Sequence, residues 1–175
     1  MPEFWKNIFG GAQPVKTTAM PQVASETLNS YTIRLGEHVP TDQAFNAWTS
    51  GDLKKMLEAI NAKTNKIDRH FLLMGIVDAT YKERFNPEMA QLCCDIAELH
   101  LNEFPSMVEP LKKDMGSTLP HVTTFQRYAT ILTEHGEFEK AVQVCERAIG
   151  YGLHDGTKSD FSGRIDRIKK LQSCI

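Results

Sequence analysis

The apolar residues from Thr41 to the end of the chain recur every three or four positions, which is the spacing of one face of an α-helix. Helix start signals divide this region into segments. The strongest is Asn86-Pro87-Glu88, because asparagine accepts bonds from free backbone amides, proline loses nothing at the first helical position, and glutamate faces the positive end of the helix. The pattern therefore predicts an all-α fold.

Other start and stop signals give the approximate extent of each helix. Thr41 or Asp42 can cap a first helix, and Thr64 or Asn65 can cap the longest one. We expect helices near residues 41–48, 53–60, 65–83, 86–101, 105–115, 121–135, 137–149 and 159–171. A brief strand-like alternation occurs in YTIRLGEHV, but no partner strand is recognisable. We interpret this stretch as an extended lead-in or as part of a helix.

Composition divides the chain into three regions. Residues 1–11 form a short amphipathic segment that ends in two glycines. Residues 12–39 are mostly polar or small and contain prolines, so we interpret them as a flexible linker. Residues 40–175 form the helical domain. With 41% hydrophobic residues in 175, the chain has enough apolar side chains for one continuous core.

Charge and hydropathy limit the partners. The 20 basic and 22 acidic residues give a net charge of -2, so no overall field draws the protein to nucleic acid. The longest apolar run, FLLMGIV, is far shorter than the ~20 residues of a membrane-spanning helix, and no leader opens the chain. The four cysteines show no CxxC spacing and suit a reducing compartment. We therefore expect a soluble, cytoplasmic protein.

No local motif indicates an enzyme, a cofactor or a metal site. The sequence contains no glycine-rich phosphate loop, no HExxH and no Gly-x-Ser-x-Gly. His135 and Glu139 are four residues apart, but a glycine between them breaks the helix. Cys94 and His100 fall on different helix faces, and His70 lies in a separate helix. A site assembled from distant residues leaves no such trace, so a helical protein with a cryptic ligand or catalytic pocket stays an alternative.

A helix, a turn and a second helix are expected between Val122 and Ile149. The informative positions are Phe125, Tyr128, Ala129 and Leu132 in the first helix, Gly136 and Phe138 in the turn, and Ala141, Cys145 and Ala148 in the second. This pattern resembles a tetratricopeptide repeat, a two-helix unit of about 34 residues in which small residues let the helices approach closely. The likeness is in spacing more than identity, since Phe replaces the family's Trp, Ala its Gly and Cys its second-helix aromatic.

An earlier segment repeats the pattern more loosely. Its first helix would carry Phe71, Met74 and Gly75, and its second Ala90, Cys94 and Ala97. Ala90 and Ala141 are 141 − 90 = 51 residues apart, longer than one repeat, because a proline-rich helix near 105–115 intervenes. The resemblance implies stacked antiparallel hairpins that form a short α-α superhelix, whereas a plain irregular bundle is the alternative.

The resemblance also implies a function. Stacked repeats leave a concave surface, lined by the first helices, that binds a peptide or an amphipathic helix. The expected partner-binding residues are Arg69, Leu72, Ile76, Ala79, Thr123, Gln126, Thr130 and Glu134. They lack the lysine, arginine and asparagine set with which some members hold a C-terminal carboxylate. An adaptor or accessory subunit is the resulting hypothesis, while Leu72 and Ile76 are alternatively core residues.

The N-terminal segment is expected to dock. Its apolar residues are Phe4, Trp5, Ile8 and Phe9. A segment this short does not fold alone, so it must pack on the domain itself, on a partner or on a membrane interface. A single lysine gives only weak membrane affinity. The alternative functions therefore include weak self-association and a peripheral membrane scaffold.

The close approach of the two helices after Val122 can be tested by enlarging one small residue. We expect Ala141→Leu to lower the free energy of unfolding by roughly 1 to 3 kcal/mol, because a longer side chain must push the helix axes apart. Thermal or urea unfolding measures the change. A midpoint unchanged from that of the parent protein would contradict the alignment.

Overall fold

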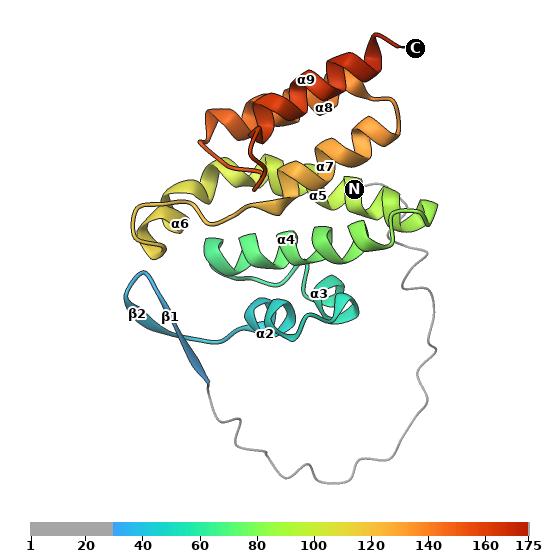
Figure 1. Ribbon diagram of the computed structural model, residues 1–175. Coiled ribbons are helices and arrows are strands. Elements are labelled where there is room, and N and C mark those ends of the chain that lie inside the picture. Colours follow the sequence, from blue (N-terminus) through green and yellow to red (C-terminus); the bar gives the residue numbers. More distant parts are fainter. Residues whose placement is uncertain (1–29, 175) are drawn as a thin grey trace, which may run out of the picture.

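Two strands and eight α-helices follow one another along residues 30–174, the part of the chain that the computed structural model describes. Figure 1 shows the helices in layers, from α2 and α3 at one end through α4 to α8 and α9 at the other, with the two strands at one side. The elements are β1 (Tyr31–Arg34), β2 (Glu37–Pro40), α2 (Gln43–Ser50), α3 (Leu53–Glu58), α4 (Lys66–Lys82), α5 (Pro87–Glu103), a 3-10 turn (Phe104–Ser106), α6 (Val108–Asp114), α7 (Thr123–Glu134), α8 (Phe138–Gly150) and α9 (Asp160–Gln172). The prediction of a largely all-α fold is confirmed.

The first four helices, α2 to α5, begin where a side chain caps them. Asp42 accepts a bond from the Phe45 amide at 2.8 Å, and Asn86 accepts one from the Glu88 amide at 2.9 Å. Asn65 accepts two amides, which makes it, and not Thr64, the cap of α4. Because each cap binds amides that have no partner inside the helix, these short polar side chains fix the helix starts.

Helix α4 lies at the centre of the stack (Figure 1). It contacts α2 and α3 on one side and α5, α6 and α7 on others. Leu72, Leu73, Ile76 and Val77 are completely buried. Gly75 lets α3 come close, since a Cβ there would lie 2.9 Å from the sulfur of Met56. The apolar run in the middle of α4 is therefore the core of the protein.

Helices α7 and α8 form the antiparallel hairpin that the sequence predicts. A short turn at Gly136 joins them, and they pack closely along their lengths. Ala129 and Ala141 have no exposed surface, and Cys145 is buried beside them in α8. Small side chains thus occupy the buried surface of this hairpin, as expected.

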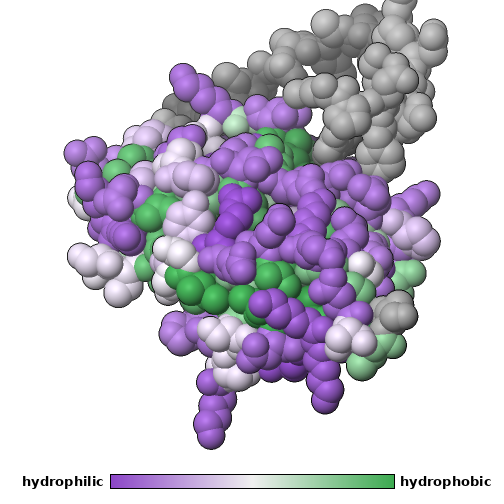
Figure 2. All heavy atoms as spheres, turned by 90° about the horizontal axis from the view of Figure 1, so that it is seen from above, coloured by the Kyte–Doolittle hydropathy of each residue, from purple (hydrophilic) through white to green (hydrophobic). Residues whose placement is uncertain are grey.

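Helix α9 closes the far end of the stack by packing on α8. Its buried side carries Phe161 and Ile168. Arg164 donates to Asp155 at 3.1 Å and to Thr130 at 3.0 Å, which ties α9 to the preceding loop and to α7. Figure 2, which looks onto this end, shows hydrophilic side chains over most of it with smaller hydrophobic areas between them.

The stretch YTIRLGEHV is a β-hairpin, so its interpretation as an extended lead-in or helix is wrong. β1 and β2 pair antiparallel, with Tyr31 opposite Pro40 and Ile33 opposite His38. Only Leu35 and Gly36 separate the two strands. Both have positive φ, 55° and 83°, as a two-residue hairpin turn requires. The predicted flexible linker 12–39 is also wrong where it can be checked, since residues 31–39 belong to the hairpin.

A buried carboxylate attaches the hairpin to the helices. Asp68 of α4 is 1% exposed and accepts bonds from the side chains of three other residues. The donors are Arg34 of β1 at 2.5 Å, Asn65 at 2.5 Å and the Trp48 indole of α2 at 3.1 Å. Because a buried charge is tolerated only when it is paired and hydrogen-bonded, Asp68 fixes the hairpin and α2 relative to α4.

The remaining predictions concern the N-terminal residues and the membrane. The docking segment with Phe4, Trp5, Ile8 and Phe9 lies outside the described residues, as does the linker up to residue 29. None of the helices in residues 30–174 combines the length and the apolar character needed to cross a bilayer.

The role of Asp68 can be tested by removing its cationic partner. We expect Arg34→Ala to lower the free energy of unfolding by about 3 kcal/mol, because the carboxylate stays buried without its counter-charge. Urea unfolding measures the loss. Adding Asp68→Asn should recover part of it, since the uncompensated charge is then gone. A double variant less stable than Arg34→Ala would contradict this explanation.

Candidate functional site

Three residues of the predicted groove do not lie on an open surface. Leu72 and Ile76 are 0% exposed, so their assignment to a partner-binding groove is wrong and they are core residues. Arg69 is engaged internally: it donates to Glu103 of α5 at 2.7 and 2.9 Å and to the carbonyl of Ile60. The reason is the position of α4, whose neighbours cover this side of the helix.

The other predicted groove residues are at least partly accessible. Ala79 and Gln126 are half-buried. Thr130 donates to the Gln126 carbonyl and accepts from Arg164. Thr123 bonds Asp78 of α4, and Glu134 bonds Arg84 in the turn that follows α4. The structure therefore brings Thr123 and Glu134 of α7 against α4 and the turn after it, but not against the face of α4 that was predicted.

The C-terminal part of α4, the turn after it and the adjoining side of α7 form a continuous cluster, which we call the α4–α7 surface. It consists of Asp78, Tyr81, Arg84, Phe85, Thr123, Arg127 and Glu134. The Arg84 guanidinium lies 4.4 Å from the ring centre of Tyr81 and 4.5 Å from that of Phe85. Arg127 lies 4.6 Å from the Tyr81 ring. Two arginines and two aromatic rings thus stack side by side.

Ion pairs hold this cluster in place. Asp78 accepts from Thr123 at 2.9 Å and from Arg127 at 3.3 Å. Arg84 donates to Glu134 at 3.0 Å, and this bond raises the pKa of the Arg84 guanidinium. Two positive and two negative side chains balance, so the α4–α7 surface is neutral. Phe85 is 84% exposed, the most exposed large apolar side chain among residues 30–174.

The sequence contained one signal for this surface. Asp78, Tyr81 and Phe85 are spaced by three and four residues, so they share one face of α4 and its C-terminal turn. Arg127 lies four residues after Thr123 on α7. The signal was missed because the repeat alignment placed the open side of α4 on the Leu72 and Ile76 face.

A separate chain of buried polar groups joins α4, α5 and α7. His70 Nδ1 lies 2.9 Å from His100 Nε2, and His100 Nδ1 lies 2.8 Å from Thr124 Oγ1. All three side chains are 0% exposed. If the Thr124 hydroxyl donates to His100 and His100 donates to His70, every group is paired except His70 Nε2, which has no partner among the described residues.

Burial keeps both imidazoles neutral. It lowers the pKa of His70 to about 4, and burial together with the neighbouring His70 lowers the pKa of His100 well below its usual value. Neutral rings can donate and accept in series, whereas a charged ring could not stay in this core. The histidine chain therefore fixes the relative position of the three helices.

The thiols of three cysteines, Cys93, Cys94 and Cys145, are not activated. Burial raises the pKa of the thiols of Cys93 and Cys145 to about 11 and that of Cys94 to about 12, so they stay protonated near neutral pH. Within residues 30–174 no three His, Cys, Asp or Glu side chains are placed to hold a metal ion.

Two cavities open on the surface. One of about 530 Å³ lies between the segment before α7 and the α8–α9 loop, and its lining includes Lys112, Leu119, His121, Tyr151 and His154. One of about 230 Å³ borders Glu98, Tyr128 and Lys140. Lys140 at 2.5 Å and the Tyr128 hydroxyl both donate to Glu98 and lower its pKa. This carboxylate is thus held by its neighbours and is a poor proton donor or acceptor.

Comparisons with known proteins add one relative. A protein of Aquifex aeolicus (strain VF5), described as an uncharacterized protein, is 26% identical over 105 residues. The match covers 58% of this chain and 50% of that protein, so the chain spans about half the length of the relative that it matches. No protein-family model matches the chain. No solved structure matches it.

The buried histidines predict a pH dependence of stability. The unfolded chain binds their protons near pH 6.5, whereas folded His70 binds one only near pH 4. The free energy of unfolding should therefore be independent of these groups above about pH 7 and should fall as the pH drops from 6.5 towards 4. For His70 alone the loss is about 3 kcal/mol, at 1.36 kcal/mol for each pKa unit.

Urea unfolding between pH 7.5 and 4.5 measures this dependence. His70→Gln should make it shallower, because one titrating group is removed. The matched control is His135→Gln, which removes an exposed histidine from the turn after α7. Equal slopes in the parent protein and His70→Gln would contradict the prediction.

Proposed function

We propose that the protein is a non-enzymatic interaction module that binds a peptide or an amphipathic helix on the α4–α7 surface. The observation that carries this proposal is Phe85, which is 84% exposed beside the stacked Arg84, Tyr81 and Arg127. Exposed aromatic and arginine side chains held in one conformation are the residues that most often dominate binding energy at protein interfaces.

The arrangement of the helices supports the proposal that they form tetratricopeptide-like repeats. In that family the first helices of successive repeats lie side by side and line the binding surface. Here α4 and α7 would be those first helices, since they contact each other and each packs on the helix that follows it. The proline-rich α6 would be an insertion between the two units.

The chemistry of the surface favours an apolar or amphipathic partner. Its charges are balanced by the pairs Asp78–Arg127 and Arg84–Glu134, so a strongly charged ligand would have to displace an existing ion pair. An apolar side chain can instead pack on the Phe85 ring without breaking any of these bonds. The ion pairs then act as a polar rim that fixes the orientation of the partner.

The compartment is part of the proposal. All four cysteines are free, including the exposed Cys174. Unpaired thiols are typical of the reducing cytoplasm. We therefore place the module, as an adaptor or accessory subunit, in the cytoplasm.

Affinity capture from the native host, followed by direct binding of the purified partner, tests this function. We expect Phe85→Glu to raise the dissociation constant of that partner at least tenfold, which corresponds to a loss of about 1.4 kcal/mol of binding free energy. Phe85 is exposed, so the variant should unfold at the same temperature as the parent protein.

The matched control is Leu171→Glu. Leu171 is 52% exposed on α9, and the substitution adds the same charge away from the α4–α7 surface. It should leave the dissociation constant unchanged. Equal affinities of the parent protein and Phe85→Glu for every direct partner would overturn the proposed binding surface.

A further inference from the structure

The outer face of the β-hairpin carries an exposed row of apolar side chains. Tyr31 is 58% exposed and Ile33 is 56% exposed, and they point to the same side because they are two residues apart in one strand. Opposite them on the same face stand Pro40 and His38, which are also exposed. No acidic side chain, arginine or lysine belongs to this face.

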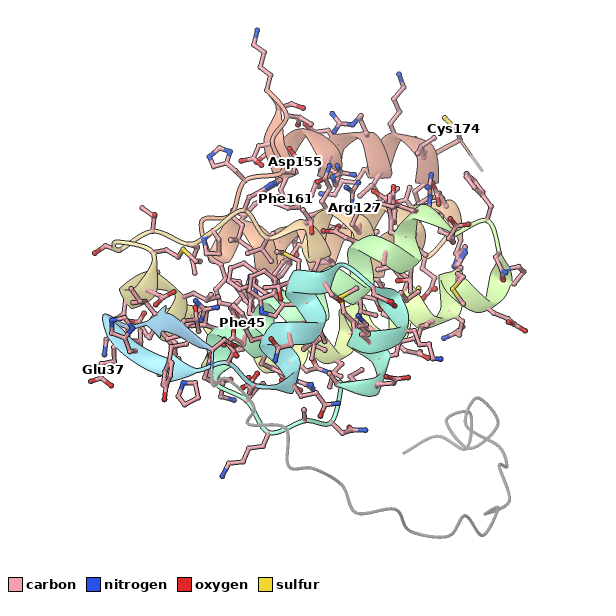
Figure 3. All side chains as sticks on the ribbon, turned by 90° about the horizontal axis from the view of Figure 1, so that it is seen from below. Glu37, Phe45, Arg127, Asp155, Phe161 and Cys174 are labelled. Carbon is pink, nitrogen blue, oxygen red and sulfur yellow. The ribbon has the colours of Figure 1, made fainter. Side chains whose placement is uncertain are left out.

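The inner face of the hairpin has a different character. Thr32, Arg34 and Val39 are half-buried towards the helices, and Arg34 reaches Asp68. Figure 3 shows the hairpin at one edge of the molecule, with Glu37 at its tip and Phe45 between it and the helices. The outer face is therefore not used by the contacts that attach the hairpin. A two-stranded hairpin needs one covered apolar face, and this one presents a second.

Leu35 in the turn strengthens the case. Its φ of 55° lies in the left-handed region, which strains leucine and is commonly occupied by Asn, Asp or Gly in such turns. The side chain is nevertheless 51% exposed, so within the described part of the chain its burial does not compensate for the strain. A large apolar residue in this strained and exposed position points to a contact that the side chain makes elsewhere.

We propose that the chain's own N-terminal segment, through Phe4, Trp5, Ile8 and Phe9, packs on the outer face of the hairpin formed by Tyr31, Ile33 and Leu35. This segment has the matching chemistry, with its four apolar residues spaced for one side of a helix and Lys6 as its one basic residue.

The size of the face favours a short tethered segment over a second copy of the protein. Three large side chains that are about half exposed offer on the order of 300 Å², taking roughly 200 Å² for each when fully exposed. A stable complex between separate proteins needs about 800 Å² on each partner. A dimer held by this face alone would therefore be too small.

The point of attachment also favours the segment. The described chain begins at Ser30, immediately before Tyr31, and 20 residues (10–29) separate it from Phe9. A coil of that length spans about 25 Å on average. Such a tether gives an effective concentration on the order of millimolar, so a small apolar contact suffices to keep the segment bound.

The chain contains two tryptophans, Trp5 and Trp48, so the full-length protein can report this contact. Labelling with 5-fluorotryptophan gives two ¹⁹F signals, and Trp5→Phe assigns them. The change in chemical shift on transfer from H₂O to D₂O measures the solvent exposure of each. We expect a small change for Trp5 in the parent protein and loss of this protection in Ile33→Glu.

Leu35→Asn separates docking from folding. Asparagine is favoured at positive φ, so this variant should unfold at the same or a higher temperature, yet Trp5 should lose its protection. Ile8→Ser, which alters only the segment, should have the same effect on Trp5. Phe85→Glu is the matched control on an exposed apolar residue of another surface, and it should leave Trp5 protected.

Four outcomes would overturn the proposal. The first is a fully solvent-exposed Trp5 in the parent protein, and the second is protection that survives both Ile33→Glu and Leu35→Asn. The third is protection that disappears on dilution as a dimer dissociates, which would assign the face to a second copy. The fourth is protection that arises only when vesicles of anionic phospholipid are added, which would assign the segment to a membrane surface.

Discussion

The burial of α4 is the constraint on which the rest of residues 30–174 depends. Leu72, Leu73, Ile76 and Val77 of its apolar run are completely buried, so neighbours must cover it on several sides. Apolar packing alone would not fix the orientation of the neighbouring elements, because it is not directional. The polar side chains of α4 supply the direction. Asp68 binds β1 and α2, His70 binds α5, and Asp78 binds α7.

The same arrangement determines where the proposed binding surface lies. Towards its C-terminal end α4 extends beyond Phe71 and Gly75, which contact Trp48 of α2 and Met56 of α3. There Tyr81 lies beside Arg127 of α7, and Phe85 in the following turn is exposed. The buried histidine chain holds α7 at a defined position, since Thr124 binds His100 and is adjacent in the chain to Thr123 of the α4–α7 surface. A rigid core thus supports the side chains proposed to make contact.

The sequence predicted the helices well and the surfaces poorly, for physical reasons that particular residues show. Helix starts depend on local bonds, so Asn86 could be identified from its neighbours alone, and Asp42 and Asn65 were each one of two expected caps. The open face of α4 could not, because FLLMGIV is apolar on every side and has no distinct hydrophobic face to orient. His70 and His100 are 30 residues apart, and only the packing of α4 on α5 brings them together. The hairpin was missed because Leu35 is an unusual residue for its turn.

The two ends of the stack are finished differently. At one end α9 covers α8 and turns Ser162, Asp166, Lys169 and Lys170 to the solvent, as expected for the last helix of a stacked array. At the other end the hairpin presents Tyr31, Ile33 and Leu35, which a solvent-facing terminus would not favour. Exposed apolar side chains are unfavourable in water at either end of the stack, so the hairpin face also favours a cover. The N-terminal segment is attached at that side, so docking there would give the stack a cap at both ends.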